Sequence, residues 1–369
     1  HVTLIPYLRA SQEMKTKPTQ ASVKELQGLG LRPDVLVCRS EYPLTVELKD
    51  KIALFCNVPS DHVLQNLDVE YLYEAPLSME KEHLAQVVCD CLHIPCPEAD
   101  LTDWRTMVDN LRHPQSETEI AIVGKYIQLH DAYLSVVEAL KHGGIAGRVN
   151  IHIRWVDSEE IERQGCEALL QGVDGILIPG GFGLRGTEGK IQAAGYAREK
   201  KIPFLGICLG MQMAIVEFAR NVAGLLDAAS TELNPDTLHP VIDLMPEQNG
   251  VENIGGTLRL GAYPCVLKEG TKAYALYGEK EIFERHRHRY EVNNDYRTIL
   301  EEQGMTMAGL SPDGHIVEMI ELKDHPFFVG TQGHPELKSR PNRAHPLFRG
   351  FVKAADTYGK EKKARRDQV

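Results

Sequence analysis

The stretch FLGICLGMQ at residues 204–212 decides the fold of the larger part of this chain. Its first half is an apolar run typical of a short buried strand, and its second half is typical of the first turn of a helix. Gly206 and Gly210 each stand two residues from Cys208, which is the spacing of a nucleophile elbow. Small neighbours permit the sharp turn that brings the central side chain into the open, and a helix N-terminus favours the reactive thiolate. Taken alone, the stretch is also compatible with an inert buried cysteine.

A candidate base and a candidate acid stand far downstream, in the motif HPE at residues 334–336. His334 can take the thiol proton and Glu336 can orient the imidazole, as in a Cys-His-acid triad. An apolar strand also leads into IPGGFG at residues 178–183, where successive glycines let backbone N–H groups turn toward an anion. These strings together disfavour the inert cysteine, and they resemble the motifs of the class I (triad) glutamine amidotransferases.

This resemblance implies an enzyme that releases ammonia from the side-chain amide of glutamine. It implies that Cys208 is the nucleophile, that His334 and Glu336 complete its triad, and that backbone N–H groups of Gly181 and Leu209 hold the oxyanion. The glutamine-binding residues that it implies are Gly181, Leu209, Gly210, Met211, Gln212, Glu232 and Arg289. A carboxylate in this set has a physical reason, because the substrate ammonium needs a partner once water is excluded.

The N-terminal third contains a second motif, KTKPTQ at residues 15–20, directly before a predicted helix over residues 21–29. Lysine and threonine side chains before a helix start suit a polyphosphate, although a solvated basic turn also explains the hexapeptide. KTKPTQ, followed by SVKELQGLG, RPDVLVCRS and KIALFCNV, resembles the CTP synthase family. The nucleotide contacts that this resemblance implies are Lys15, Thr16, Lys17, Pro18, Thr19, Gln20 and Lys51 for UTP or CTP, and Val69 for ATP.

The CTP synthase resemblance implies ATP-dependent amination of UTP with ammonia from glutamine. It implies ATP and Mg²⁺ as cofactors, GTP as an allosteric activator, and a homotetramer that forms filaments in some members. Arg185 and Gly186 are candidates for the GTP contact, with an ordinary surface arginine as the alternative. No G-x-x-x-x-G-K-[ST] phosphate loop occurs in the sequence. We therefore expect the ATP loop and magnesium ligands in a segment before His1, and glutamine hydrolysis at most from this chain alone.

The alternation of apolar strands with helical patterns predicts an α/β fold with two doubly wound domains and mostly parallel sheets. In the first domain, residues 35–38 and 52–56 are predicted strands of an incomplete sheet. The expected divisions are residues 1–112 for the C-terminal part of a P-loop-type synthetase domain, 113–118 for a linker, 119–359 for a Rossmann-like class I glutamine amidotransferase domain, and 360–369 for a disordered basic tail.

Composition and charge exclude several classes of protein. The formal net charge of −11 argues against nucleic acid as the main partner. No apolar run reaches the roughly 20 residues of a membrane span. Eight cysteines in 369 residues do not make a disulfide framework, and a nucleophilic thiol suits a reducing compartment. We therefore expect a cytoplasmic protein without a membrane partner.

Three further segments contain candidate binding residues. The pattern C-x-C-x-H-x-x-C at residues 89–96 fits no common zinc site, so no metal ligand is predicted. RHRHRYE at residues 285–291 would place its arginines on one face of a strand and its histidines on the other. Arginine suits a planar carboxylate such as that of glutamine, and a solvated basic strand is the alternative. Residues 249–261, rich in Gly and Asn, are predicted to form a mobile lid.

Two other functions stay open from the sequence. A stand-alone amidase or peptidase of the same fold would use the triad without a nucleotide, and KTKPTQ and RHRHRYE argue against it. A non-catalytic regulatory or filament-forming fragment would use no triad, and a glutaminase assay would separate it from the main interpretation.

Overall fold

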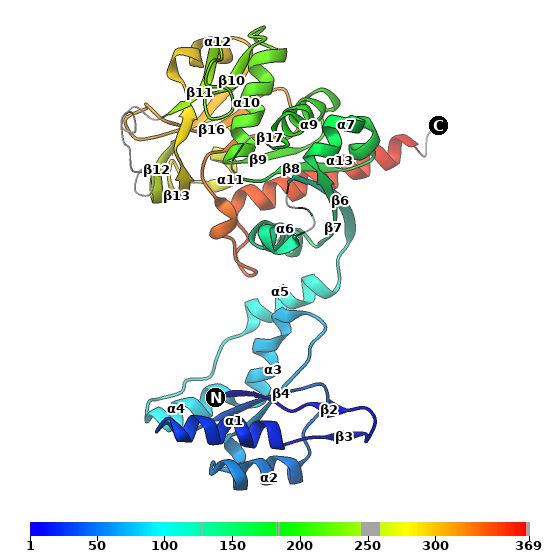
Figure 1. Ribbon diagram of the computed structural model, residues 1–369, viewed down its shortest axis with the longest axis vertical. Helices are drawn as coiled ribbons and strands as arrows, with labels where there is room; N and C mark the ends of the chain where they lie inside the picture. The colour runs from blue at the N-terminus through cyan, green and yellow to red at the C-terminus, as the bar shows by residue number, and fades with distance from the viewer. Residues whose placement is uncertain (126, 128, 182, 184, 245–258, 367–369) are drawn as a thin grey trace. The chain divides into compact units, whose positions relative to one another are not determined.

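The computed structural model describes residues 1–369 except 126, 128, 182, 184, 245–258 and 367–369. Contacts divide the chain into two compact units, His1–Val108 and Asp109–Val369 (Figure 1). Within the described residues, no helix combines the length and the apolar character needed to cross a membrane.

A small parallel sheet organises the first unit. Its strand order is β1-β4-β5, and β2 pairs with β3 in a separate antiparallel ribbon. Helices α1 and α2 contact each other, and together with the sheet they enclose an apolar core. The main elements before β6 are β1 (Val2–Leu4), β2 (Tyr7–Leu8), β3 (Glu13–Met14), α1 (Lys17–Gly28), β4 (Leu36–Ser40), α2 (Val46–Cys56), β5 (Val63–Leu67), α3 (Ala75–Lys81), α4 (Leu84–Leu92) and α5 (Thr102–Arg112).

One predicted strand is wrong, because residues 52–56 lie in helix α2. The hydroxyl of Thr45 caps the start of this helix, and Asn57 ends it in the left-handed conformation. The buried positions have helical spacing: Ile52, Ala53 and Cys56. Leu54 and Phe55 between them are exposed by 78% and 62%. A short apolar run fits a strand and a helix equally well, so the flanking cap residues decide; the neighbouring strand of the sheet is β5 instead.

A nine-stranded sheet organises the second unit, in the order β13-β12-β15-β16-β17-β9-β8-β6-β7. The main helices and strands of the second unit, from β6 onward, are β6 (Ser116–Gly124), α6 (Leu134–Gly147), β7 (Val149–Asp157), α7 (Ser158–Gln164), α8 (Cys166–Leu170), β8 (Gly175–Ile178), α9 (Thr187–Lys200), β9 (Phe204–Ile207), α10 (Leu209–Asn221), β10 (Ala228–Ser230), β11 (His239–Leu244), β12 (Arg259–Leu267), α11 (Lys272–Tyr277), β13 (Glu281–His288), β14 (Tyr290–Val292), α12 (Arg297–Glu302), β15 (Met305–Leu310), β16 (Val317–Leu322), β17 (Phe328–Thr331) and α13 (Pro346–Arg366). A small sheet of β10, β11 and β14 accompanies it.

The large sheet has a parallel half and an antiparallel half. Strands β17, β9, β8, β6 and β7 are parallel neighbours, whereas β13, β12, β15, β16 and β17 are antiparallel neighbours. Successive residues of β6 supply two separate cores: Ala121 packs with α9 and α10, and Ile120 packs with α6 and α13. The predicted α/β class with helices on both faces of the sheet is confirmed. The sequence did not predict that half of the sheet would be antiparallel.

The last helix of the chain includes most of the basic C-terminal residues. The prediction of a disordered tail from residue 360 is wrong as far as Arg366, because helix α13 continues to that residue. Lys360 pairs with Asp356 one turn earlier at 2.5 Å, and Lys362 reaches Asp174 at 2.5 Å, so the basic residues are anchored. Most of the predicted lid, residues 249–258, lies outside the described residues.

Candidate active site

Cys208 occupies a strained turn between β9 and α10. Its backbone has φ 52° and ψ −106°, a conformation that residues other than glycine rarely adopt. A Cβ atom added to Gly206 would lie 2.8 Å from the backbone of Gly210, and one added to Gly210 would lie 2.1 Å from the carbonyl oxygen of Ile178. Both flanking glycines are therefore required by close backbone packing. The turn is further held by the N–H of Cys208, which donates to the carbonyl of Thr331 at 2.7 Å.

His334 and Glu336 follow β17 and reach the same turn. Nδ1 of His334 lies 2.7 Å from Oε1 of Glu336, and a Cβ added to Gly180 would lie 2.9 Å from the His334 ring and 3.5 Å from the Cys208 Cβ. Burial lowers the pKa of His334, but hydrogen bonds to Cys208 and Glu336 outweigh burial and raise it to about 10. The imidazole therefore carries a proton at neutral pH, and a positive charge beside the sulfur favours the thiolate.

A cavity of about 640 Å³ opens onto these three side chains. Gly180 and Gly181 form one wall, and Arg285 and Arg287 of β13 contribute another. Leu209 is the first residue of α10, where helix N–H groups have no intrahelical partner. The cavity thus brings a nucleophile, a base, glycine N–H groups and positive charge to one place, which suits a small amide substrate with a carboxylate.

The remaining predicted glutamine contacts divide into buried and partly exposed residues. Met211 is fully buried in the core, so a contact from it would come from the backbone. Gln212 is also buried, and its Nε2 donates to the carbonyl of Tyr290 at 3.0 Å. Glu232 accepts from the N–H of Gly183 at 3.4 Å.

The charges of Glu232 and Arg289 both act on the phenol group of Tyr290. Burial and Glu232 raise the pKa of Tyr290, while Arg289 lowers it. The opposite charges of a carboxylate and a guanidinium suit the two α-groups of an amino acid. Neither residue belongs to the described lining of the cavity at Cys208, so the sequence prediction is only partly reproduced there.

The RHRHRYE segment has the predicted alternation. Along β13 the arginines Arg285 and Arg287 are exposed, and His286 and His288 are buried. The N–H of His334 donates to the carbonyl of Arg285 at 2.7 Å. The strand therefore holds the histidine loop with its backbone while presenting arginines to the cavity.

Two buried residues near the nucleophile were missed by sequence reasoning. Nε2 of Gln332 donates to Sγ of Cys208 at 3.5 Å. Nζ of Lys190 would lie 3.8 Å from a Cβ atom added to Gly181. Burial of Lys190 lowers its pKa to about 8, and the nearby charge of Lys125 contributes to this decrease. Gln332 lies two residues before His334, and this proximity in sequence could have indicated that it lies near the nucleophile.

The KTKPTQ segment lies at the start of α1 in the first unit, and half of it serves the fold. The hydroxyl of Thr19 donates to the carbonyl of Leu4 at 3.1 Å and accepts from Thr3 at 2.9 Å, in a fully buried position. Thr16 accepts from Nε2 of Gln20 at 3.1 Å. The structure therefore gives these three polar residues of the motif internal partners.

The cations of this region converge on β3. Lys15 forms an ion pair with Glu13. The pKa of Glu13 is lowered first by Lys15 and also by the charge of Lys51, so both lysines lie near this carboxylate. Lys17 and Pro18 are exposed at the first turn of α1, and Val69 follows β5 in a half-buried position.

The cysteine-rich segment at residues 89–96 does not form a ligand cluster. A hydrogen bond with Cys89 raises the pKa of Cys96, and Sγ of Cys91 lies 3.8 Å from Nδ1 of His62. Within the described part of the chain, the one group of three potential metal-binding side chains is His286, His288 and Glu318.

Arg185, the candidate effector contact, already has partners. It lies 2.9 Å from Glu159 and donates to the carbonyl of Lys125 at 3.1 Å. It lines a shallow pocket of about 560 Å³ together with Glu159, Glu162 and Glu188. These carboxylates oppose a phosphate at that place, so Arg185 would have to leave Glu159 to bind one.

Comparison with known proteins agrees with this geometry. Residues 128–354 match the family model of the class-I glutamine amidotransferases, and residues 1–94 match that of the CTP synthase N-terminus. A CTP synthase from Ruminiclostridium cellulolyticum is 60% identical over 97% of this chain and 67% of its own length. The chain belongs to the CTP synthase family. A second member, from Caldanaerobacter subterraneus, is 57% identical over 96% of this chain and 66% of its own length, so the chain spans about two thirds of these relatives.

A solved structure supports the assignment of the second unit to this family. The glutaminase domain of Trypanosoma brucei CTPS with bound acivicin matches 65% of this chain and 94% of that chain, with a TM-score of 0.62 and 38% identity. The predictions of a CTP synthase relationship and of a class I amidotransferase domain are confirmed.

Proposed function

We propose that this chain hydrolyses glutamine at Cys208 and, as part of a CTP synthase, supplies the ammonia that converts UTP to CTP with ATP. The observation that carries the proposal is the meeting of Cys208, His334 and Glu336 at one cavity. Gly180 lies against both side chains, because a Cβ added there would be 2.9 Å from the His334 ring and 3.5 Å from the Cβ of Cys208. Membership of the CTP synthase family supports the fate of the ammonia.

The chemistry follows from the atoms at the cavity. The sulfur of Cys208 attacks the amide carbon of glutamine, and the oxygen gains negative charge that N–H groups of Gly181 and Leu209 stabilise. His334 gives its proton to the nitrogen as the carbon–nitrogen bond breaks, which releases ammonia and leaves a thioester. His334 then takes a proton from water, whose oxygen attacks the thioester carbon. The carbon–sulfur bond breaks, glutamate leaves, and the Cys208 thiolate and protonated His334 are restored. Glu336 keeps the Nδ1–H of His334 in place throughout.

Binding of the substrate amino acid is assigned to groups around the elbow. Glu232 is assigned to the α-ammonium and Arg289 to the α-carboxylate, supported by the opposite effects of their charges on the pKa of Tyr290. Backbone groups of Gly210 and Met211, together with Gln212, complete the site.

The nucleotide half of the proposal assigns UTP and its product CTP to Lys15, Lys17 and Lys51, with Pro18 at the helix start. ATP would contact Val69, and Mg²⁺ would neutralise its phosphates during phosphorylation of the UTP oxygen. GTP as activator near Arg185, a homotetramer with filaments and a cytoplasmic location complete the proposal. These parts rest on the family relationship alone.

A glutaminase assay tests the proposal directly. The chain should release glutamate from glutamine, and Cys208→Ala should reduce the rate on the order of 10³-fold or more. Cys166→Ala, a matched change outside the site, should leave the rate unchanged. CTP should also raise the unfolding temperature, which a stand-alone amidase of the same fold would not show. Glutamate release by Cys208→Ala at the wild-type rate would contradict the assignment.

A further inference from the structure

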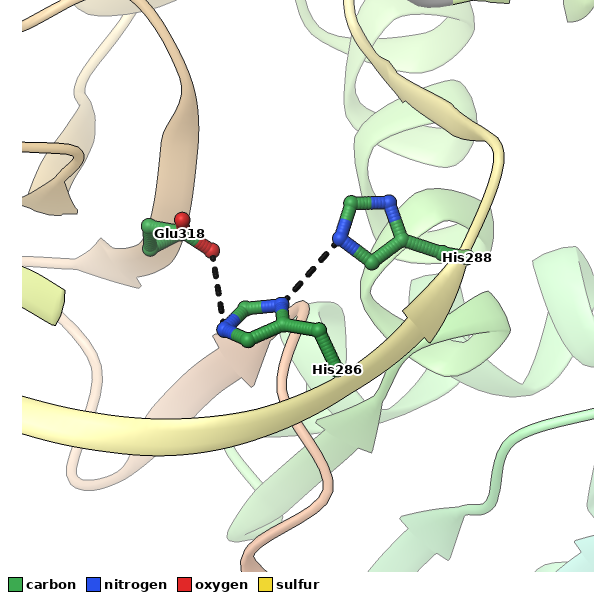
Figure 2. A group of neighbouring side chains, drawn as sticks. All are labelled: His286, His288 and Glu318. Atoms are coloured by element: carbon green, nitrogen blue, oxygen red, sulfur yellow. Dashed lines mark hydrogen bonds and ion pairs between the residues drawn. The ribbon is translucent and has the colours of Figure 1, made fainter. Parts of the chain in front are cut away.

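A row of buried polar groups leads to the sulfur of Cys208 through the protein interior. Its distant end is the buried cluster of His286, His288 and Glu318 shown in Figure 2. Nδ1 of His286 lies 3.1 Å from Nε2 of His288, and Nδ1 of His288 lies 3.1 Å from the carbonyl oxygen of Tyr290. From His286 onward, the row is therefore a succession of direct hydrogen bonds as far as this carbonyl.

Two glutamines continue the row from the carbonyl of Tyr290 to the nucleophile. Nε2 of Gln212 donates to that carbonyl at 3.0 Å and to Oε1 of Gln332 at 3.1 Å. Nε2 of Gln332 then lies 3.5 Å from Sγ of Cys208. All three side chains are at least 96% buried, so these contacts are shielded from water.

The carbonyl of Tyr290 sets the direction of the glutamine hydrogen bonds. A carbonyl oxygen only accepts, so Gln212 must turn its NH₂ group toward it. The second hydrogen of that NH₂ group then meets Gln332, which must present its oxygen to Gln212. Gln332 has its own NH₂ group left for the sulfur of Cys208. A backbone atom in β14 thus decides that the sulfur faces a donor.

The arrangement of the three residues in Figure 2 favours a row of polar contacts over a metal site. Their ligand atoms come within 4.8 Å of one another, but His286 turns one ring nitrogen to His288 and the other to Glu318, so the atoms lie in a row. Arg259 also lies 2.5 Å from Oε1 of Glu318, and its charge opposes a second cation. The cluster is better described as the anchored end of the hydrogen-bond row.

We propose that Gln332 stabilises the thiolate of Cys208 by donating an N–H group to it, and that Gln212 and the carbonyl of Tyr290 orient that donor. The inference rests on the proposed role of Cys208 as the nucleophile. A hydrogen bond to an anion is stronger than one between neutral groups, and burial strengthens it further. Gln332 is well placed for this role, because its backbone N–H donates to the carbonyl of Glu318 at 2.8 Å and holds it in register.

The test is the pH dependence of Cys208 alkylation by iodoacetamide, read by peptide mass spectrometry. Gln332→Met removes the donor while keeping the length of the side chain. On the rising part of its pH profile, the alkylation rate of Cys208 should fall about tenfold, so the whole profile should move to higher pH. With glutamine, kcat should fall more than KM changes. Gln303→Met, a matched change at an exposed residue, should alter neither readout.

The outcomes separate this inference from the proposed function. A folded Gln332→Met variant with the wild-type alkylation profile would overturn the inference, whatever its glutaminase activity. A shifted profile in a chain that hydrolyses no glutamine would support the inference and count against the proposed function. If Gln332→Met does not fold, Gln332→Leu decides by the same assay, and a wild-type profile there would overturn the inference as well.

Discussion

The elbow in the second unit and the KTKPTQ segment in the first unit are both short motifs at the start of a helix, yet they are built differently. At the elbow, the positions of Cys208 and His334 follow from close packing against glycines that tolerate no Cβ. At KTKPTQ, the buried hydroxyl of Thr19 serves the fold, while Lys17 is exposed and free of such packing. The difference teaches that the side chains at the elbow are preorganised by the fold, whereas an exposed lysine such as Lys17 would take its position from a bound ligand.

The largest effect is expected from a methyl group added at Gly180, which tests whether packing positions the side chains at the elbow. Gly180→Ala places a Cβ 2.9 Å from the His334 ring, so the ring must move away from Cys208. A displacement of about 1 Å costs on the order of 100-fold in rate. We expect kcat for glutamate release to fall accordingly, while CTP binding is unchanged. Gly172→Ala, at a glycine with open space around it, controls for the change in residue type, with loss of stability alone expected from its positive φ. Full activity in Gly180→Ala would contradict the packing argument.

Removal of a single exposed cation tests the other side of the comparison. Lys17→Ala should weaken CTP binding by about 1.5–3 kcal/mol, because one charged contact to a phosphate is lost. The effect should shrink with added salt, since the site is exposed. Calorimetric titration gives the affinity, and Lys24→Ala on the exposed side of the same helix is the matched control. Equal affinities of the two variants would remove Lys17 from the site.

The buried carboxylate at the end of the hydrogen-bond row predicts a dependence of stability on pH. Burial raises the pKa of Glu318 from 4.5 to about 7, with partial compensation by Arg259 and a further increase from Asp313. The folded chain therefore holds a proton that the unfolded chain releases from about pH 4.5 upward, and the stability contribution is lost as pH rises through this window. Nε2 of the neighbouring His286 and Oε2 of Glu318 lack hydrogen-bond partners among the described residues, which fits a proton between them.

Glu318→Gln removes this titration without changing the shape of the side chain. Relative to the wild type, its free energy of unfolding should rise with pH between 4.5 and 7 by at most about 1.4 kcal/mol per pH unit, and then level off. Urea unfolding at pH 5 and pH 8 gives the two values, and Glu281→Gln at an exposed position of β13 is the control. A pH-independent difference would show that Glu318 is ionised throughout.

The smallest expected effect concerns a residue that the motif suggested for binding and the structure assigns to the fold. Thr19→Val removes the hydroxyl that links α1 to Leu4 and Thr3. We expect a loss of about 1 kcal/mol in the free energy of unfolding of the first unit, with CTP affinity of the folded protein retained. A large loss of affinity without loss of stability would return Thr19 to the nucleotide site.

These two regions also show what a sequence reveals. The elbow was predictable because its geometry depends on Gly206 and Gly210, each two residues from Cys208. The histidine–carboxylate pair was predictable because Glu336 follows His334 by two residues. The donor role of Gln332 was not predictable, because its direction depends on a backbone carbonyl and a second glutamine from distant segments. Residues 52–56 were mistaken for a strand, because the caps at Thr45 and Asn57 carry the information and the apolar run does not.

The central claim is that Cys208 and His334 form a charged pair held by Glu336. The direct measurement is an NMR titration of the His334 imidazole in the wild type and in Cys208→Ala. We expect a pKa near 10 in the wild type, where the sulfur and Glu336 both stabilise the charged ring. In Cys208→Ala the pKa should fall substantially, because burial then opposes the charge with one partner fewer. An ordinary pKa in the wild type, or the same raised value in both proteins, would contradict the account.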